Sequence, residues 1–169
     1  LLGTTKVLRV AEGVALAKQA VAAGRTPVVL ADHSDRSGYA TWLLREIIAQ
    51  GLSRTLVATI AAPDAIAGLL DAGVKPGDAV EVEIGGRVDP SAGEPVHIIG
   101  QVLLIADATT ARAKGRGQAW VAIRFGDGNV VVLSPFLVQI IEPDELWGLG
   151  LVAADYDVIA IKSRVHFRR

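Results

Sequence analysis

PVVLADHSDRSG, residues 27–38, is the stretch of sequence that decides the fold. Its first part, residues 28–30, is an apolar run after a proline, which predicts a strand buried on both faces. Residues 32–38 are polar or flexible, and a helix-like segment, residues 39–50, follows. In a strand–loop–helix unit the loop lies at the carboxyl end of the strand, where open α/β sheets bind ligands. We therefore expect the binding site of this protein in this loop.

The segments on both sides of this loop alternate between predicted helices and strands. Small apolar residues at spacings of three and four predict a helix over residues 6–23 that Gly24 ends. Residues 55–60 are β-branched and apolar, which predicts a second buried strand, and a third helix is predicted from Pro63 to Gly73. This alternation favours a parallel sheet with right-handed crossovers.

Between residues 77 and 141 the pattern changes to short strands separated by turns. The glycines and polar residues at 126–129 predict a hairpin, and Gly100 predicts a bulge or sharp bend within its strand. A last apolar strand, residues 157–161, is expected to rejoin the parallel sheet after a short helix near residues 143–148. The strands expected in this segment span residues 80–84, 96–105, 119–125, 130–133 and 137–141.

These patterns predict an α/β fold with a small parallel or mixed sheet and flanking helices. We expect one domain over residues 1–169, made of an α/β part (1–76 and 142–169) and an antiparallel β-rich subdomain (77–141). A small barrel is one form that this subdomain can take.

Composition limits the classes of function. The chain of 169 residues is 51% hydrophobic, and 17 basic against 18 acidic residues give a net charge of −1, so nucleic acid is not an expected partner. No apolar run reaches the ~18 residues of a membrane span, and cysteine is absent, which excludes disulfides and thiolate sites and is compatible with the cytoplasm. The absence of methionine and the start at Leu1 predict a piece of a longer protein or a processed product.

The loop after the first strand carries two carboxylates, an imidazole, two hydroxyls and a guanidinium. Ser34 or Ser37 can cap the following helix, whose amino end attracts anions, and Arg36 can add a charged contact. The alternative is that these residues only fix the turn. Consecutive loop residues seldom converge on one zinc ion, and a helical pair of metal ligands is absent. The ligand-binding candidates here are Asp32, His33, Ser34, Asp35, Arg36, Ser37 and Gly38.

A second group of candidates follows the last predicted strand. If that strand lies beside the first one, its polar continuation faces the same crevice as the loop, and the alternative is a fraying basic terminus. Nucleophile-elbow, Walker and dinucleotide motifs are absent, so we assign no catalytic residue and no metal ligand. The candidates in this group are Lys162, Ser163, His166 and Arg168.

PVVLADHSD, followed by a helix that contains Leu43-Leu44-Arg45, and the ending KSRVHFR together resemble the C-terminal domain of the microcystinase C (MlrC) family. The likeness also includes the DPSAGEPV and LVQIIEPDELWGLG segments, but the two end motifs are the specific part. In that family two aspartates and a glycine-rich loop follow the strand, which Asp32, Asp35 and Gly38 match. Phe167 completes the match to the closing motif. The glycine-rich insertion is much shorter in this chain.

The resemblance implies a bacterial, zinc-dependent, metallopeptidase-like hydrolase whose zinc ligands belong to an N-terminal domain. It therefore implies that this chain holds no cofactor itself and is an accessory or substrate-shaping half, inactive alone, whose polar groups join a site completed by that N-terminal domain or a partner chain. One alternative is a stand-alone binding module for a small anionic ligand. Another is a self-sufficient metal hydrolase that uses Asp32, His33, Asp35 and His166. Self-association of the chain stays open.

Overall fold

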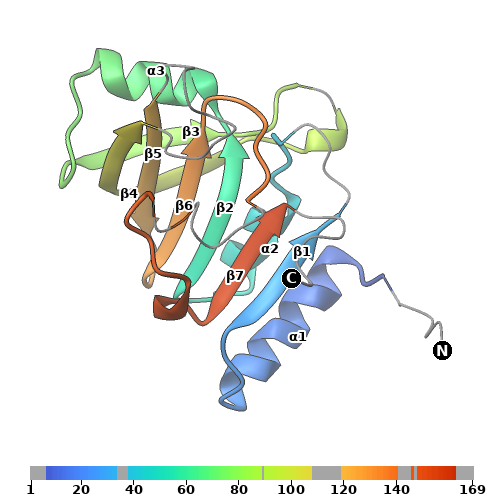
Figure 1. Ribbon diagram of the computed structural model, residues 1–169. Helices are drawn as coiled ribbons and strands as arrows, with labels where there is room; N and C mark the ends of the chain where they lie inside the picture. Colours follow the sequence, from blue (N-terminus) through green and yellow to red (C-terminus); the bar gives the residue numbers. More distant parts are fainter. Residues whose placement is uncertain are drawn as a thin grey trace.

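A seven-stranded mixed sheet forms the centre of the computed structural model, which describes residues 7–33, 38–88, 90–107, 119–140, 146 and 148–162. The strands lie in the order β1-β7-β2-β6-β5-β4-β3 (Figure 1). This mixed sheet with flanking helices confirms the predicted fold class. The strands are β1 (Val28–Asp32), β2 (Thr55–Ala61), β3 (Ala79–Ile84), β4 (Val96–Asp107), β5 (Ala119–Phe125), β6 (Asn129–Ser134) and β7 (Val158–Lys162).

In the described part of the chain, α1, α2, α3 and two short 3₁₀ helices accompany the sheet. Gly24 ends the first helix in the left-handed conformation, with φ +72°, and Pro63 occupies the first turn of the third, as predicted. No helix in the described part of the chain is long and apolar enough to cross a membrane. The helices are α1 (Val10–Ala22), α2 (Trp42–Ala49), α3 (Pro63–Asp71), η1 (Pro90–Ala92) and η2 (Ala153–Asp155).

The parallel half of the sheet contains β1, β7, β2 and β6. The last strand, β7, pairs with β1 on one side and β2 on the other, so it rejoins the parallel sheet as the sequence predicts. β1 is consequently an edge strand. The prediction that residues 28–30 are buried on both faces is wrong, because Val29 remains 46% exposed at this edge.

The antiparallel half continues the same sheet. β6 pairs with β2 in parallel and with β5 in antiparallel orientation, and β4 and β3 follow outward. The sheet of the described residues has two edges, β1 and β3, and is therefore open rather than a closed barrel. Residues 137–140 form no strand, although Val138 and Ile140 pack into a buried core, so the fifth strand predicted there is wrong in its described part.

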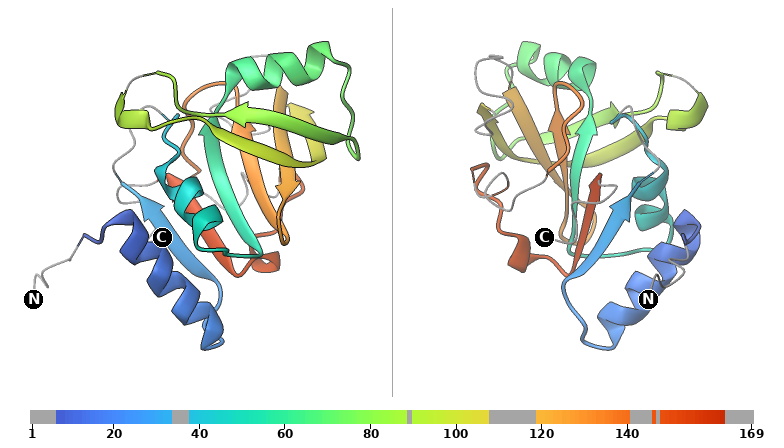
Figure 2. Two further views of the ribbon diagram at one scale, coloured as in Figure 1. Left: turned by 180° about the vertical axis from the view of Figure 1, so that it is seen from behind. Right: turned by 45° about the vertical axis from the view of Figure 1, so that its right-hand side comes forward.

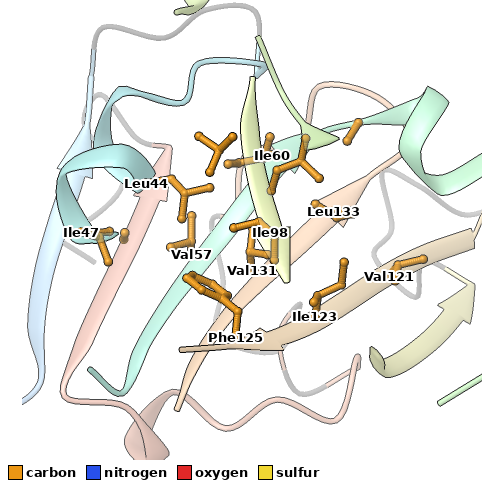
Figure 3. Close-up of a cluster of buried hydrophobic side chains, with 14 of the residues drawn as sticks. Leu44, Ile47, Val57, Ile60, Ile98, Val121, Ile123, Phe125, Val131 and Leu133 are labelled. Carbon is orange, nitrogen blue, oxygen red and sulfur yellow. The ribbon is translucent and has the colours of Figure 1, made fainter. Parts of the chain in front are cut away.

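The helices cover one face of the sheet and build the main core. Figure 2 shows α1 and α2 beside β1 and β2, with α3 at the other end of the sheet, where it contacts β3, β5 and β6. Alternate residues of the central strands meet these helices, and Figure 3 shows Leu44 and Ile47 of α2 near Val57 of β2. This alternation reflects the two-residue period of a strand. The labelled core also includes Ile60, Ile98, Val121, Ile123, Phe125, Val131 and Leu133.

The opposite face of the sheet carries a second, smaller core. Leu56 and Ala58 of β2 and Trp120 of β5 point to this face, where Val138, Ile140 and neighbouring residues of the β6–β7 connection cover them. Both faces of β2 are therefore covered, which confirms the prediction that it is a buried strand. Covering both faces also explains why the central parts of β2 and β6 are almost wholly apolar in the sequence.

In β2 and β4, a bulge changes which face of the sheet the following side chains point to. In β2 the register shifts at Thr59, so Ile60 faces the main core although Leu56 and Ala58 face the second one. In β4 the register shifts between Val102 and Leu104. The predicted irregularity is therefore displaced from Gly100, which has a different role: a Cβ there would lie 2.3 Å from the Arg124 carbonyl oxygen.

The side-chain amide of Asn129 connects the β5–β6 hairpin to the start of β2 through two hydrogen bonds. Its Oδ1 accepts a hydrogen bond from Thr55 N at 3.0 Å, and its Nδ2 donates to Leu52 O at 2.9 Å. Asn129 is only 4% exposed, so water cannot easily replace either partner.

Replacing Asn129 by alanine is expected to lower the free energy of unfolding by about 2 kcal/mol, because a buried amide N–H and a buried carbonyl lose their partners. Urea denaturation followed by circular dichroism measures this change. Asp127→Ala is the control, because Asp127 is exposed in the same turn and bonds Arg54 through its carbonyl oxygen, which the substitution retains. Equal losses for the two variants would contradict the structural role of the Asn129 amide.

Candidate functional site

The carboxyl ends of β1 and β7 bring together Asp32 and Lys162, one residue from each of the two predicted groups of polar residues. Asp32 and Lys162 are register partners in the parallel pair, and Lys162 Nζ lies 3.4 Å from Asp32 Oδ2. They come from positions 130 residues apart in the chain. The condition set from the sequence, that the last strand lies beside the first, is therefore met.

Lys162 is an internal residue and not part of an exposed basic tail. It is 5% exposed, and its amine also donates to the Ala40 carbonyl at 3.1 Å. The side chain of Asp32 is only 11% exposed. Taking a carboxylate and an ammonium group out of water is costly unless they face each other and find further hydrogen bonds. The contacts of Lys162 with Asp32 and Ala40 meet that requirement.

A small pocket lies beneath this ion pair. Besides Asp32, Ala40 and Lys162, it is lined by the middle of β2 around Thr59, by β7 and by the first turn of α2. The Thr59 hydroxyl donates to Val138 O at 2.9 Å, which directs this polar group toward the β6–β7 connection. The charges of the other two polar residues that line the pocket, Asp32 and Lys162, compensate each other through their ion pair.

Of the predicted residues in the first loop, the structure describes Asp32, His33 and Gly38. His33 is exposed directly after β1. Gly38 is buried at the end of β2, where its carbonyl accepts a hydrogen bond from Ala61 N at 2.8 Å. Its φ is +79°, and a Cβ would lie 2.7 Å from Leu137 Cδ1, so glycine is required there. Ser34, Asp35, Arg36, Ser37, Ser163, His166 and Arg168 lie outside the described residues.

The N-cap of α2 differs from the prediction. The helix begins at Trp42 and its N-cap is Thr41, so neither Ser34 nor Ser37 caps it. Thr41 is fully buried, and its hydroxyl donates to Glu94 O at 2.7 Å instead of capping the helix. The predicted helix start at residue 39 was therefore too early, because residues 39–41 are fixed by contacts with the β3–β4 loop.

Sequence reasoning missed the backbone carbonyl of Ala40, which is a partner of Lys162. Every residue has a backbone carbonyl, so the residue type alanine does not indicate that this carbonyl accepts a hydrogen bond from a distant lysine. Thr59 was also missed, because threonine is an ordinary strand residue and does not mark a bulge in the sequence.

The described donors do not fit a metal ion. Among the residues that the structure describes, no three His, Asp or Glu side chains gather closely enough to hold one. At Asp32, the ammonium group of Lys162 would also repel a cation. Asp35 and His166, the other donors considered from the sequence, fall in the part of the chain that is not described. We therefore derive no metal chemistry from this chain.

The fold and these strand ends define an α/β domain with a polar cluster at the carboxyl edge of a mixed sheet. The family model described as "MlrC C-terminus" matches residues 30–169, so the chain belongs to that family. The resemblance noted from the two end motifs is thereby confirmed. Among the curated proteins, none matches the chain.

A solved structure shares this fold. It is that of a candidate metallopeptidase from Mesorhizobium sp. BNC1, with a TM-score of 0.74 and 15% sequence identity. The similarity covers 96% of this chain and 34% of that protein, so this chain spans about a third of its length. At this level of identity the similarity concerns the fold alone.

Proposed function

We propose that this chain is the accessory, substrate-shaping C-terminal domain of a microcystinase C-like zinc hydrolase. In this proposal it contributes polar groups to a site that an N-terminal domain or a partner chain completes. The zinc ligands and the reacting groups belong to that other part. The proposal places the protein in the bacterial cytoplasm, with which the absence of cysteine is compatible.

The observation that carries the proposal is the meeting of Asp32 and Lys162 at neighbouring strand ends. His33 and Ser163 are the next residues in the chain, so both polar segments start from this point. The carboxyl edge of an open α/β sheet is where such folds bind ligands. Family membership and the 34% coverage of the Mesorhizobium protein support a role as one part of a larger protein.

In this proposal the ion pair supports the site and does not bind the ligand itself. The Lys162 ammonium group points to Asp32 and Ala40, so its charge is already compensated. In this proposal the exposed side chain of His33 contacts the substrate. Asp35 and His166 would join it if they face the same edge of the sheet. The roles of Ser34, Arg36, Ser37, Ser163 and Arg168 as ligand contacts remain predictions.

The test compares the 169-residue chain with the longest product encoded by its gene, if the reading frame extends upstream of Leu1. Elemental analysis measures zinc, and a fluorogenic peptide library measures hydrolysis. We expect stoichiometric zinc and hydrolysis only in the longer product, and a roughly tenfold lower kcat/KM after His33→Ala with zinc content unchanged. Lys75→Ala, an exposed lysine in the α3–β3 connection, is the control.

Two results with the isolated chain would overturn the proposal. Stoichiometric zinc together with hydrolysis would establish a self-sufficient metal hydrolase instead. A rise of the melting temperature with phosphate or sulfate, abolished by Arg36→Ala, would establish a stand-alone anion-binding module, because a ligand that binds only the folded state stabilises it.

A further inference from the structure

We infer that the β3–β4 loop, residues 85–88 and 90–95 of the described chain, is a positioning element of the candidate site. It fixes residues 39–41 of the β1–α2 connection, and through them the amine of Lys162. The inference deepens the proposed function, on which its relevance to a substrate rests. Figure 2 shows this loop and η1 beside the segment that leads into α2.

Hydrogen bonds tie the loop to residues 39–42. Gly86 N donates to Tyr39 O at 2.8 Å, and Thr41 N donates to Ala92 O at 3.0 Å. The Thr41 hydroxyl donates to Glu94 O at 2.7 Å. The Trp42 indole Nε1 donates to the carbonyl of Ser91 at 2.8 Å. Both backbone and side-chain groups thus hold the connection from one side.

The same contact requires glycine in the loop. A Cβ on Gly85 would lie 2.6 Å from Thr41 Cγ2 and 2.8 Å from Tyr39 O, and Gly85 has φ +66°. A Cβ on Gly93 would lie 3.0 Å from both Thr41 Oγ1 and Trp42 Cε2. The backbone of the loop is therefore packed closely against Tyr39 O and the side chains of Thr41 and Trp42, which leaves the connection little freedom to shift.

Ala40 joins this contact to the ion pair. Its two neighbours, Tyr39 and Thr41, bond the β3–β4 loop, while its own carbonyl accepts the hydrogen bond from Lys162 Nζ at 3.1 Å. Displacing residues 39–41 would therefore remove one partner of Lys162 and uncover its amine. In this way a loop about 50 residues further along the chain controls the polar cluster at the β1 and β7 ends.

The reactivity of Lys162 toward an amine-acylating reagent, read by mass spectrometry, tests the inference. Lys162 should react slowly in the native chain compared with exposed Lys75. In Gly85→Ala we expect Lys162 to react about fivefold faster or more, with Lys75 unchanged, because local opening exposes a group without global unfolding. Hydrogen exchange of the β6 amides reports global unfolding in the same samples.

Gly73→Ala is the matched control. Gly73 has φ +70°, close to that of Gly85, but a Cβ there would meet nothing within 4 Å. The two variants thus share the backbone strain and differ in the contact. If Gly85→Ala does not fold, Thr41→Val carries the test, since it keeps the side-chain shape and removes the hydroxyl that reaches Glu94. Thr41→Ser keeps that hydroxyl and should restore slow acylation.

Selective acceleration at Lys162 in Gly85→Ala or Thr41→Val, reversed in Thr41→Ser, supports the inference. Equal acceleration in Gly73→Ala, or acceleration that parallels exchange of the β6 amides, overturns it in favour of general destabilisation. Unchanged acylation in folded variants also overturns it. None of these outcomes depends on zinc or hydrolysis, so this inference and the proposed function can fail separately.

Discussion

Replacing Lys162 by methionine is expected to lower the free energy of unfolding by about 3 kcal/mol. The substitution leaves the Asp32 carboxylate in a site where its side chain is only 11% exposed, and it removes the donor to the Ala40 carbonyl. Breaking a buried pair by removing one partner is strongly destabilising, because the remaining charge is no longer compensated. Urea denaturation followed by far-UV circular dichroism gives the value.

The double variant separates charge from packing. Adding Asp32→Asn to Lys162→Met removes the buried carboxylate that has lost the Lys162 ammonium group, and should recover about half of the loss or more. Lys75→Met changes an exposed lysine and should stay within about 0.5 kcal/mol of the native chain. A Lys162→Met variant as stable as Lys75→Met would mean that the pair contributes nothing to folding.

Gly100→Ala is the second change with a large expected effect. The added Cβ would lie 2.3 Å from Arg124 O and 2.9 Å from Ile123 Cγ2, so β4 and β5 would have to move apart. Forcing a methyl group into a packed core typically costs between about 1 and 3 kcal/mol, and we expect a value near 3 because the obstructing atom is backbone. The midpoint of urea denaturation measures the loss.

The control is a glycine in helix α3. A Cβ on Gly68 would meet nothing within 4 Å, and alanine is the better helix former, so Gly68→Ala should raise the free energy of unfolding by up to about 1 kcal/mol. The two identical substitutions should thus act in opposite directions. Destabilisation of similar size in both would contradict the close approach of β4 and β5.

Much of the fold was predictable because local patterns and burial agree. Residues 55–60 read as a strand with no exposed face, and β2 is covered on both sides by the two cores. The edge position of β1 was not predictable, because a short apolar run looks alike at the centre and at the rim of a sheet. The segment 137–140 was mistaken for a strand for a related reason: Val138 and Ile140 alternate as in a strand and belong to the second core, although the segment forms no strand.

The candidate site divides in the same way. The sequence showed that polar residues follow β1 and end β7. That Asp32 and Lys162 lie side by side depends on the strand order, which places β7 next to β1. That Lys162 turns inward to Asp32 and Ala40 was not visible, since a lysine near a chain end usually signals a solvated surface.

The sequence by itself determined most of the strands and helices, apart from the segment 137–140 and the start of α2, and which of them end in polar residues, because periodicity, glycine and proline act within a few residues of the chain. Only the tertiary structure decided that β7 lies between β1 and β2, that Lys162 is buried against Asp32, and that the β3–β4 loop holds residues 39–41. These features join groups about 50 to 130 residues apart, and their energy comes from desolvation and close packing.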